Sequence, residues 1–128
     1  MYIMFSIKKS VLLLSFIAVI MSINAQTYTS LNNENFAKQL KSKKLQLVDV
    51  RTPSEYASGH LPKAINIDFK NQDFEKNILK LKKKKKVAVY CRSGVRSKKA
   101  AEIISKNNYI VIELNTGISK WNGDIVTE

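Results

Sequence analysis

Cys91 is the single cysteine of this 128-residue chain, and it stands between an apolar run and a small basic turn. Residues 87–90 are apolar or aromatic, and a helix-like stretch follows the turn from about Ser97 onward. This order places the thiol at the carboxyl end of a strand and beneath the amino end of a helix. Free backbone N–H groups and the helix dipole favour an anion there. The thiolate is the nucleophilic form of cysteine, so the spacing predicts a reactive thiol.

The turn after the cysteine contains groups that could bind a small anion next to the thiol. Successive backbone N–H groups of a tight turn can form an anion-binding nest, and Gly94 permits the backbone angles that such a turn requires. Arg92 and Arg96 carry fixed positive charge suited to a sulfonate or sulfite, although only one of them need point inward, and Arg92 is the one more simply explained as a surface arginine. Cys91 is therefore the candidate catalytic residue. The candidate substrate-binding residues are Arg92, Ser93, Gly94, Val95 and Arg96.

A single cysteine restricts the chemistry further. The chain cannot form an internal disulfide, a Cys-x-x-Cys dithiol centre or a zinc site built on several cysteines. In an exported protein, an unpaired cysteine suggests a working thiol or an intermolecular bridge. Neither a metal nor an organic cofactor is expected.

Three motifs follow one another along the chain. Residues 47–67 contain Asp-Val-Arg and then Glu-Tyr-Ala-Ser-Gly-His-Leu-Pro, residues 91–97 read Cys-Arg-Ser-Gly-Val-Arg-Ser, and residues 117–121 read Gly-Ile-Ser-Lys-Trp. Together they resemble the first signature, the active-site loop and the closing motif of rhodanese-like sulfurtransferases. Lys63 and Thr116 stand where that family usually has glycine. The resemblance covers the chain from about Leu31 to its end.

The resemblance implies a fold, a reaction and a set of partners. The expected fold class is α/β, with a central parallel sheet of about five short strands and helices on both faces. Cys91 would carry a persulfide whose sulfur comes from a small sulfur-containing anion such as thiosulfate and passes to a small thiol or a protein. Asp49 and Arg51 occupy positions that brace this region in the family, so they are predicted as supporting residues.

Two other readings of the cysteine loop stay open. A cysteine-dependent phosphatase would have Cys-x5-Arg, whereas Cys91 and Arg96 form Cys-x4-Arg, a tighter cradle that suits a single sulfur atom. A rhodanese-like module that only binds a partner would usually lack the cysteine, which this chain keeps, although a binding or sulfur-carrier role could coexist with the thiol. His60 is more simply explained as a residue that stabilises its own turn than as a base, and Trp121 as a packing residue.

Apolar periodicity and capping residues predict the elements that would position these groups. Asp49, Arg51 and Cys91 all fall at the carboxyl ends of predicted strands, where parallel sheets bind their ligands. Strands are predicted at 45–50, 64–67, 86–90 and 109–114, and helices at 33–40 after an Asn32 or Asn33 cap, at 53–58, at 74–81, from a Ser97 cap to 106, and at 118–121.

The start of the chain has the pattern of a secretory signal. Lys8 and Lys9 precede a 13-residue apolar run, and Ala25 offers a small residue at a cleavage site. An uncleaved membrane anchor is the alternative, but spanning a bilayer takes about 20 apolar residues. We expect residues 1–25 to be a signal peptide, 26–30 a short polar lead-in and 31–128 the rhodanese-like domain. The protein would then be exported, most simply to a periplasm, without stable membrane insertion after cleavage.

The composition is strongly basic, with 22 Lys and Arg residues, 10 Asp and Glu residues and a net charge of +12. Five consecutive lysines occupy positions 82–86. Such a run is usually a solvated turn, and the alternative is an electropositive patch for an acidic surface. Nucleic acid is not an expected partner because no aromatic residues are interleaved with the lysines.

Overall fold

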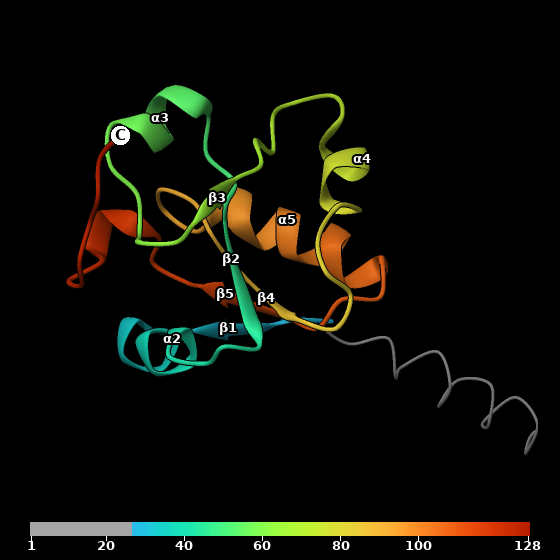
Figure 1. Cartoon of the computed structure of the whole chain (residues 1–128), viewed down its shortest axis with the longest axis horizontal. Helices are drawn as coiled ribbons and strands as arrows, with labels where there is room; N and C mark the ends of the chain where they lie inside the picture. The colour runs from blue at the N-terminus through green and yellow to red at the C-terminus, as the bar shows by residue number, and fades with distance from the viewer. Residues whose placement is uncertain (1–26) are drawn as a thin grey trace, which may run out of the picture.

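The computed structural model describes residues 27–128, which form a parallel β-sheet between two layers of helices (Figure 1). The predicted α/β fold with about five short strands is confirmed. Along the chain the elements are β1 (Thr29–Leu31), α2 (Asn33–Leu40), β2 (Leu45–Asp49), α3 (Pro53–Ala57), β3 (Ile65–Asn66), α4 (Phe74–Ile78), β4 (Lys86–Tyr90), α5 (Val95–Lys106), β5 (Val111–Leu114) and the 3-10 helix η1 (Ile118–Lys120).

The sheet has the strand order β1-β5-β4-β2-β3, and every pair of neighbours is parallel. The central strand β4 is apolar and buried from Val87 to Tyr90, as expected for a strand that is covered on both faces. In the register, Asp49 at the end of β2 lies opposite Tyr90 at the end of β4. The residues that follow these strands therefore emerge at the same edge of the sheet.

Two hydrophobic clusters fill the spaces on either side of the sheet. One lies beneath α4 and α5 and includes Val89, Ile78 and Ile104. The other lies beneath α2, α3 and η1 and includes Phe36 and Leu114. Figure 1 shows α2 and α5 on opposite sides of the strands. The alternating helices and strands thus produce the expected three layers.

Strand β1 corrects the prediction that residues 26–30 are a lead-in outside the domain. Residues 29–31 pair in parallel with β5, from Thr29 opposite Ile112 to Leu31 opposite Leu114. The strand has three residues, of which only Leu31 is apolar, so it has no periodicity of its own. Its place is determined by pairing with the edge of β5.

The start of helix α5 also differs from the prediction. The expected cap was Ser97, but the helix begins at Val95, with Gly94 as its N-cap at φ 100°. Ser97 is therefore a buried residue of the first turn. Lys63, which replaces a glycine usual in the family, has φ 66°, a left-handed conformation that glycine adopts more readily.

The predicted signal peptide at residues 1–25 lies outside the described residues. Within residues 27–128, no helix has both the length and the apolar character needed to cross a membrane.

Candidate active site

Cys91 lies immediately after β4, and only 1% of it is exposed. Its sulfur accepts hydrogen bonds from the backbone N–H groups of Gly94, at 3.1 Å, and Ser97, at 3.3 Å. The hydroxyl of Ser97 is 3.4 Å from the same sulfur. Although the side chain is buried, its sulfur therefore faces hydrogen-bond donors. Two aimed N–H groups suit a thiolate or a persulfide anion.

The segment Gly117–Ser119 holds the cysteine loop from outside. The N–H of Ile118 donates to the carbonyl oxygen of Cys91 at 2.9 Å, and the N–H of Ser119 donates to that of Arg92 at 3.0 Å. A Cβ on Gly117 would lie 2.2 Å from the Arg92 oxygen, so no side chain fits there. Because the carbonyl oxygens of Cys91 and Arg92 point toward this segment, N–H groups of the loop can point toward the sulfur. This explains why the closing motif belongs to the site.

Gly94 is constrained by geometry as well. Its φ of 100° is unfavourable for other residues, and a Cβ would lie 2.2 Å from the carbonyl oxygen of Asn115. The glycine therefore allows the turn to pass close to the end of β5 and to direct its N–H at the sulfur.

The two arginines of the loop have different surroundings. Arg96 is half-buried and forms a two-pronged ion pair with Glu55, with nitrogen–oxygen distances of 2.8 and 2.9 Å. Glu55 also closes a capping box with Thr52 at the start of α3. Arg92 is exposed. The structure therefore leaves Arg92 as the loop cation in contact with solvent, while Arg96 ties α3 to α5.

The Glu55–Arg96 pair predicts an acid-dependent loss of stability. Hydrogen bonds from Arg96 lower the pKa of Glu55 from 4.5 to about 2. Since the folded-state pKa is depressed, the stabilisation is present above pH 4.5 and is lost as the pH falls toward 2. We expect the free energy of unfolding of the wild type to fall through this window more steeply than that of Glu55→Gln, as measured by urea unfolding. Parallel pH profiles of the two proteins would contradict the pairing.

Asp49 and Arg51 form a buried pair beside the cysteine loop. The distance between Arg51 Nη2 and Asp49 Oδ2 is 2.8 Å, and the backbone N–H of Arg51 donates to Asp49 Oδ1 at 2.9 Å. Arg51 also donates to the carbonyl oxygen of Gly59 at 2.6 Å. The Arg51 guanidinium lies 5.9 Å from the ring centroid of Tyr90, the residue before Cys91. The pair thus connects β2 with the turn after α3 and supports the end of β4.

Two polar residues near the thiol, Glu113 and Lys98, were not predicted as parts of the site. Glu113 is fully buried on β5 and accepts hydrogen bonds from Ser97 Oγ at 2.5 Å and Ser30 Oγ at 2.6 Å. Lys98 Nζ lies 3.4 Å from the same carboxylate. Glu113 thus anchors the first turn of α5, including the hydroxyl that contacts Cys91, to the sheet. The sequence feature that could have indicated its role is that Glu113 is the single acidic residue in the otherwise apolar run of residues 109–114.

His60 and Trp121 take part in packing. The His60 ring stacks on Tyr56 at 3.8 Å, and its Nδ1 lies 2.9 Å from the Tyr56 carbonyl oxygen. Trp121 packs edge-on against Phe36 with ring centroids 6.1 Å apart. Within residues 27–128, no group of three or more His, Cys, Asp or Glu side chains could hold a metal ion.

Comparison with known proteins agrees with this architecture. The family described as "Rhodanese-like domain" matches residues 32–124. Residues of this chain are 39% identical to the Bacillus subtilis protein YqhL over 84 positions, which cover 65% of each protein. A protein named sulfurtransferase from Allochromatium vinosum is 31% identical over 93 residues, covering 71% of this chain and 85% of its own length.

A solved structure is similar over most of the described fold. The crystal structure of a rhodanese-related protein from Thermoplasma volcanium has a TM-score of 0.71 at 29% identity, covering 79% of this chain and 100% of that one. Some relatives are much longer, and the match spans only 33% of the tRNA uridine(34) hydroxylase of Pelagibacter ubique. It spans 65% of YqhL, which is just under two thirds of that protein.

Proposed function

Because this chain belongs to the rhodanese-like domain family, we propose that it is a sulfurtransferase in which Cys91 carries a sulfane sulfur. The observation that supports this most is the pair of N–H groups, from Gly94 and Ser97, that donate to the Cys91 sulfur. Relatives named sulfurtransferase and thiosulfate:glutathione sulfurtransferase agree with the same class of reaction.

The reaction we propose has two displacement steps. The Cys91 thiolate attacks the outer sulfur of thiosulfate, the sulfur–sulfur bond of the donor breaks, and sulfite leaves with the electron pair. An acceptor nucleophile, a small thiol or a protein, then attacks the terminal sulfur of the Cys91 persulfide, and the thiolate is restored as the leaving group. The same N–H groups of Gly94 and Ser97 hold the anion before and after each step.

The charge distribution favours an anionic donor. The ion pair with Glu55 offsets much of the charge of Arg96, whereas Arg92 is exposed at the loop. We therefore assign to Arg92 the contact with the sulfonate of the donor, and to Arg96 the stability of the loop. A guanidinium matches the oxygens of a sulfonate in geometry and charge.

The depth of the sulfur bears on donor and acceptor size. With Cys91 only 1% exposed, the thiol is reached most easily by a small donor. A persulfide extends outward by one sulfur–sulfur bond of about 2.05 Å, so its terminal sulfur is more accessible than the thiol itself. This geometry suits a small donor and an acceptor that can be a small thiol or a protein.

The direct test is mass spectrometry after incubation with thiosulfate. We expect the peptide containing Cys91 to gain one sulfur, about 32 Da, and to lose it on addition of cyanide or a thiol, because sulfane sulfur passes between thiolate nucleophiles. An unmodified Cys91 peptide at saturating thiosulfate and persulfide donors would contradict the proposal.

A sulfur-carrier role is the second candidate. The chain is 30% identical over 102 residues to a putative sulfur carrier protein of Bacillus subtilis, of which it covers 54%. A carrier would form the same persulfide but would release its sulfur only to a specific protein. Turnover with small acceptors therefore separates the two functions.

We also propose that residues 1–25 direct export to a periplasm, on the basis of their basic start, 13-residue apolar run and small residue at the cleavage position.

A further inference from the structure

The edge of the sheet opposite Cys91 has a composition unlike the rest of the surface. All strands are parallel, so their amino ends gather at one edge and Cys91 emerges at the other. We call the first of these the amino edge. It comprises residues 41–44 before β2, residues 79–85 before β4 with Lys86 at the start of that strand, and residues 106–110 before β5.

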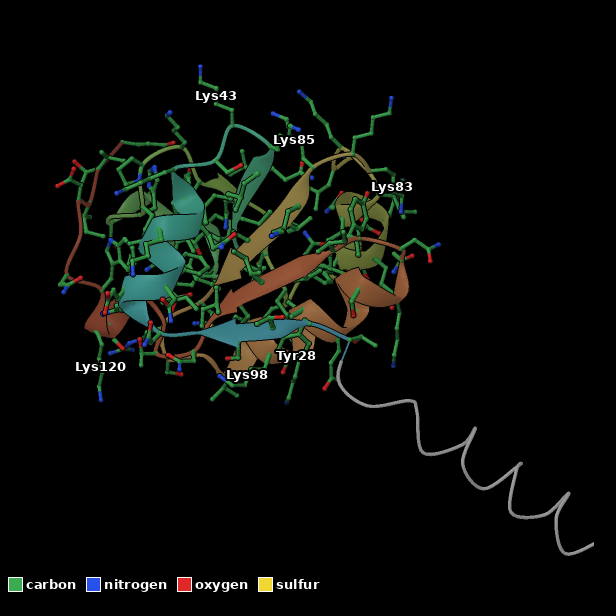
Figure 2. The ribbon with its side chains drawn as sticks, turned by 90° about the horizontal axis from the view of Figure 1, so that it is seen from below. Tyr28, Lys43, Lys83, Lys85, Lys98 and Lys120 are labelled. Carbon is green, nitrogen blue, oxygen red and sulfur yellow. The ribbon has the colours of Figure 1, made fainter. Side chains whose placement is uncertain are left out.

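The amino edge concentrates positive charge without acidic neighbours in sequence. Segments 38–48, 76–87 and 103–112 contain no Asp or Glu. Their exposed lysines that belong to the amino edge are Lys41, Lys43, Lys44, Lys80, Lys82, Lys83, Lys84 and Lys106. Figure 2 shows Lys43 and Lys85 at the top of the view and Lys83 at its upper right, whereas Tyr28, Lys98 and Lys120 lie at the bottom.

The lysine turn is held in place by the sheet. The Gln46 side-chain amide donates to the carbonyl oxygens of Lys82, at 2.7 Å, and Lys85, at 3.2 Å, and its oxygen accepts from the N–H of Lys82 at 3.0 Å. The N–H of Lys86 donates to the carbonyl oxygen of Lys44 at 3.1 Å, which joins the two lysine-bearing loops. The backbone of both lysine-bearing loops is therefore held on the sheet by these hydrogen bonds.

Apolar side chains are interspersed with these lysines. Leu79 is 56% exposed and Ile110 is 71% exposed, the latter directly before β5. A groove at the amino edge is lined by Lys41, Lys43 and Lys85 and by apolar residues that include Leu40, Leu45 and Ile65. Lysines around exposed apolar groups are the composition of protein surfaces that bind at a membrane interface.

The preceding part of the chain joins the domain at the same edge. Thr27, the first described residue, contacts the hydroxyl of Ser105 near the end of α5 with its own hydroxyl at 2.6 Å. Residues 1–26, which contain the apolar run 11–23, connect here. Cleavage after residue 25, as proposed above, would place the start of the mature chain at the amino end of β1.

We propose that the amino edge is a binding surface for the anionic phospholipid head groups of a membrane. Lysines near an anionic bilayer are attracted to it, and exposed apolar groups add to the binding by entering the interface. Cys91, at the opposite edge, then faces the aqueous phase and its sulfur donors. This surface is independent of the sulfur chemistry.

The first experiment compares vesicles of phosphatidylcholine with and without phosphatidylglycerol, using the full chain in a flotation assay. The test variant is Lys43→Gln/Lys82→Gln/Lys84→Gln, and the matched control with the same charge change is Lys70→Gln/Lys99→Gln/Lys120→Gln; all six lysines are exposed. The wild type and both variants contain the apolar run 11–23, so the ratio of binding to anionic and to neutral vesicles measures the contribution of the substituted lysines.

We expect that ratio to fall by about tenfold or more in the test variant, and much less in the control, because each lysine near an anionic surface contributes to binding. Raising the salt concentration should remove the preference of the wild type for anionic vesicles. Lysine acetylation read by mass spectrometry should show protection of positions 82–84 by anionic vesicles, and none at Lys99 or Lys120.

Equal losses in the two triple variants, absence of a preference for anionic vesicles or uniform acetylation would each overturn the proposal. The last two results would exclude anionic lipid as the ligand of this edge, and an acidic protein would be the next candidate. Sulfur transfer by the test variant should match that of the wild type, so a failure of the lipid proposal is distinguishable from a failure of the proposed enzyme.

Discussion

Replacement of Cys91 by serine is expected to reduce sulfur transfer to the level of the uncatalysed reaction. Cys91 is the only cysteine in the sequence, so no second thiol can take over the sulfur. A serine hydroxyl can accept the same N–H groups from Gly94 and Ser97, but it is not ionised near neutral pH and does not form a persulfide. Transfer from thiosulfate to cyanide measures the loss, and the Cys91 peptide should no longer gain mass.

The fold of this variant should survive, because serine is similar in size and meets polar partners in the loop. Far-UV circular dichroism and thermal unfolding provide the check. Ser54→Ala, at an exposed position on α3, is a control that should retain full activity. Transfer that persists in folded Cys91→Ser would rule out Cys91 as the sulfur carrier.

Truncation of Asp49 to alanine should have the largest effect on stability. Arg51 is only 6% exposed and would lose the carboxylate that now accepts from its guanidinium at 2.8 Å. Removing one partner of a buried ion pair leaves an uncompensated charge, which costs about 3–5 kcal/mol. Urea unfolding should show this decrease in the free energy of unfolding, and transfer activity should fall with the loss of the support behind Tyr90.

Asp73→Ala is the matched control because Asp73 is exposed and makes no capping hydrogen bond at α4. A surface substitution of this kind should change stability by no more than about 0.5 kcal/mol. Asp49→Asn, which keeps an acceptor for Arg51 but loses the charge, should be intermediate. If Asp49→Ala were as stable as Asp73→Ala, the buried pair would not brace the site.

Much of the architecture was readable from local patterns. Strand β4, the turn after it and helix α5 are consecutive in the chain, so the thiol's position under a helix amino end follows from neighbours in sequence. Asn32 or Asn33 was predicted as the cap of α2, and the side chain of Asn32 does accept from the N–H of Asn35. Local hydrogen bonds and apolar periodicity act over a few residues, which is why they leave a visible signal.

Long-range partners left little signal. Glu55 and Arg96 are 41 positions apart, and Ser97 and Glu113 are 16 apart, yet both pairs are in direct contact near the cysteine loop. The carbonyl of Arg92 excludes a side chain at Gly117. Ser97 was predicted as a cap because serine is favoured there, but the tertiary structure starts the helix at Val95 and uses Ser97 at the sulfur.

By itself, then, the sequence determined the order of the strands and helices from α2 onward, the candidate nucleophile Cys91 and the edge of the sheet where it emerges. Only the tertiary structure decided which groups touch the sulfur, which arginine is neutralised by Glu55, and that Thr29–Leu31 completes the sheet. The physical reason is that a short strand or a buried ion pair is stabilised by residues far away in the chain, and such partners are identified only when the chain is packed.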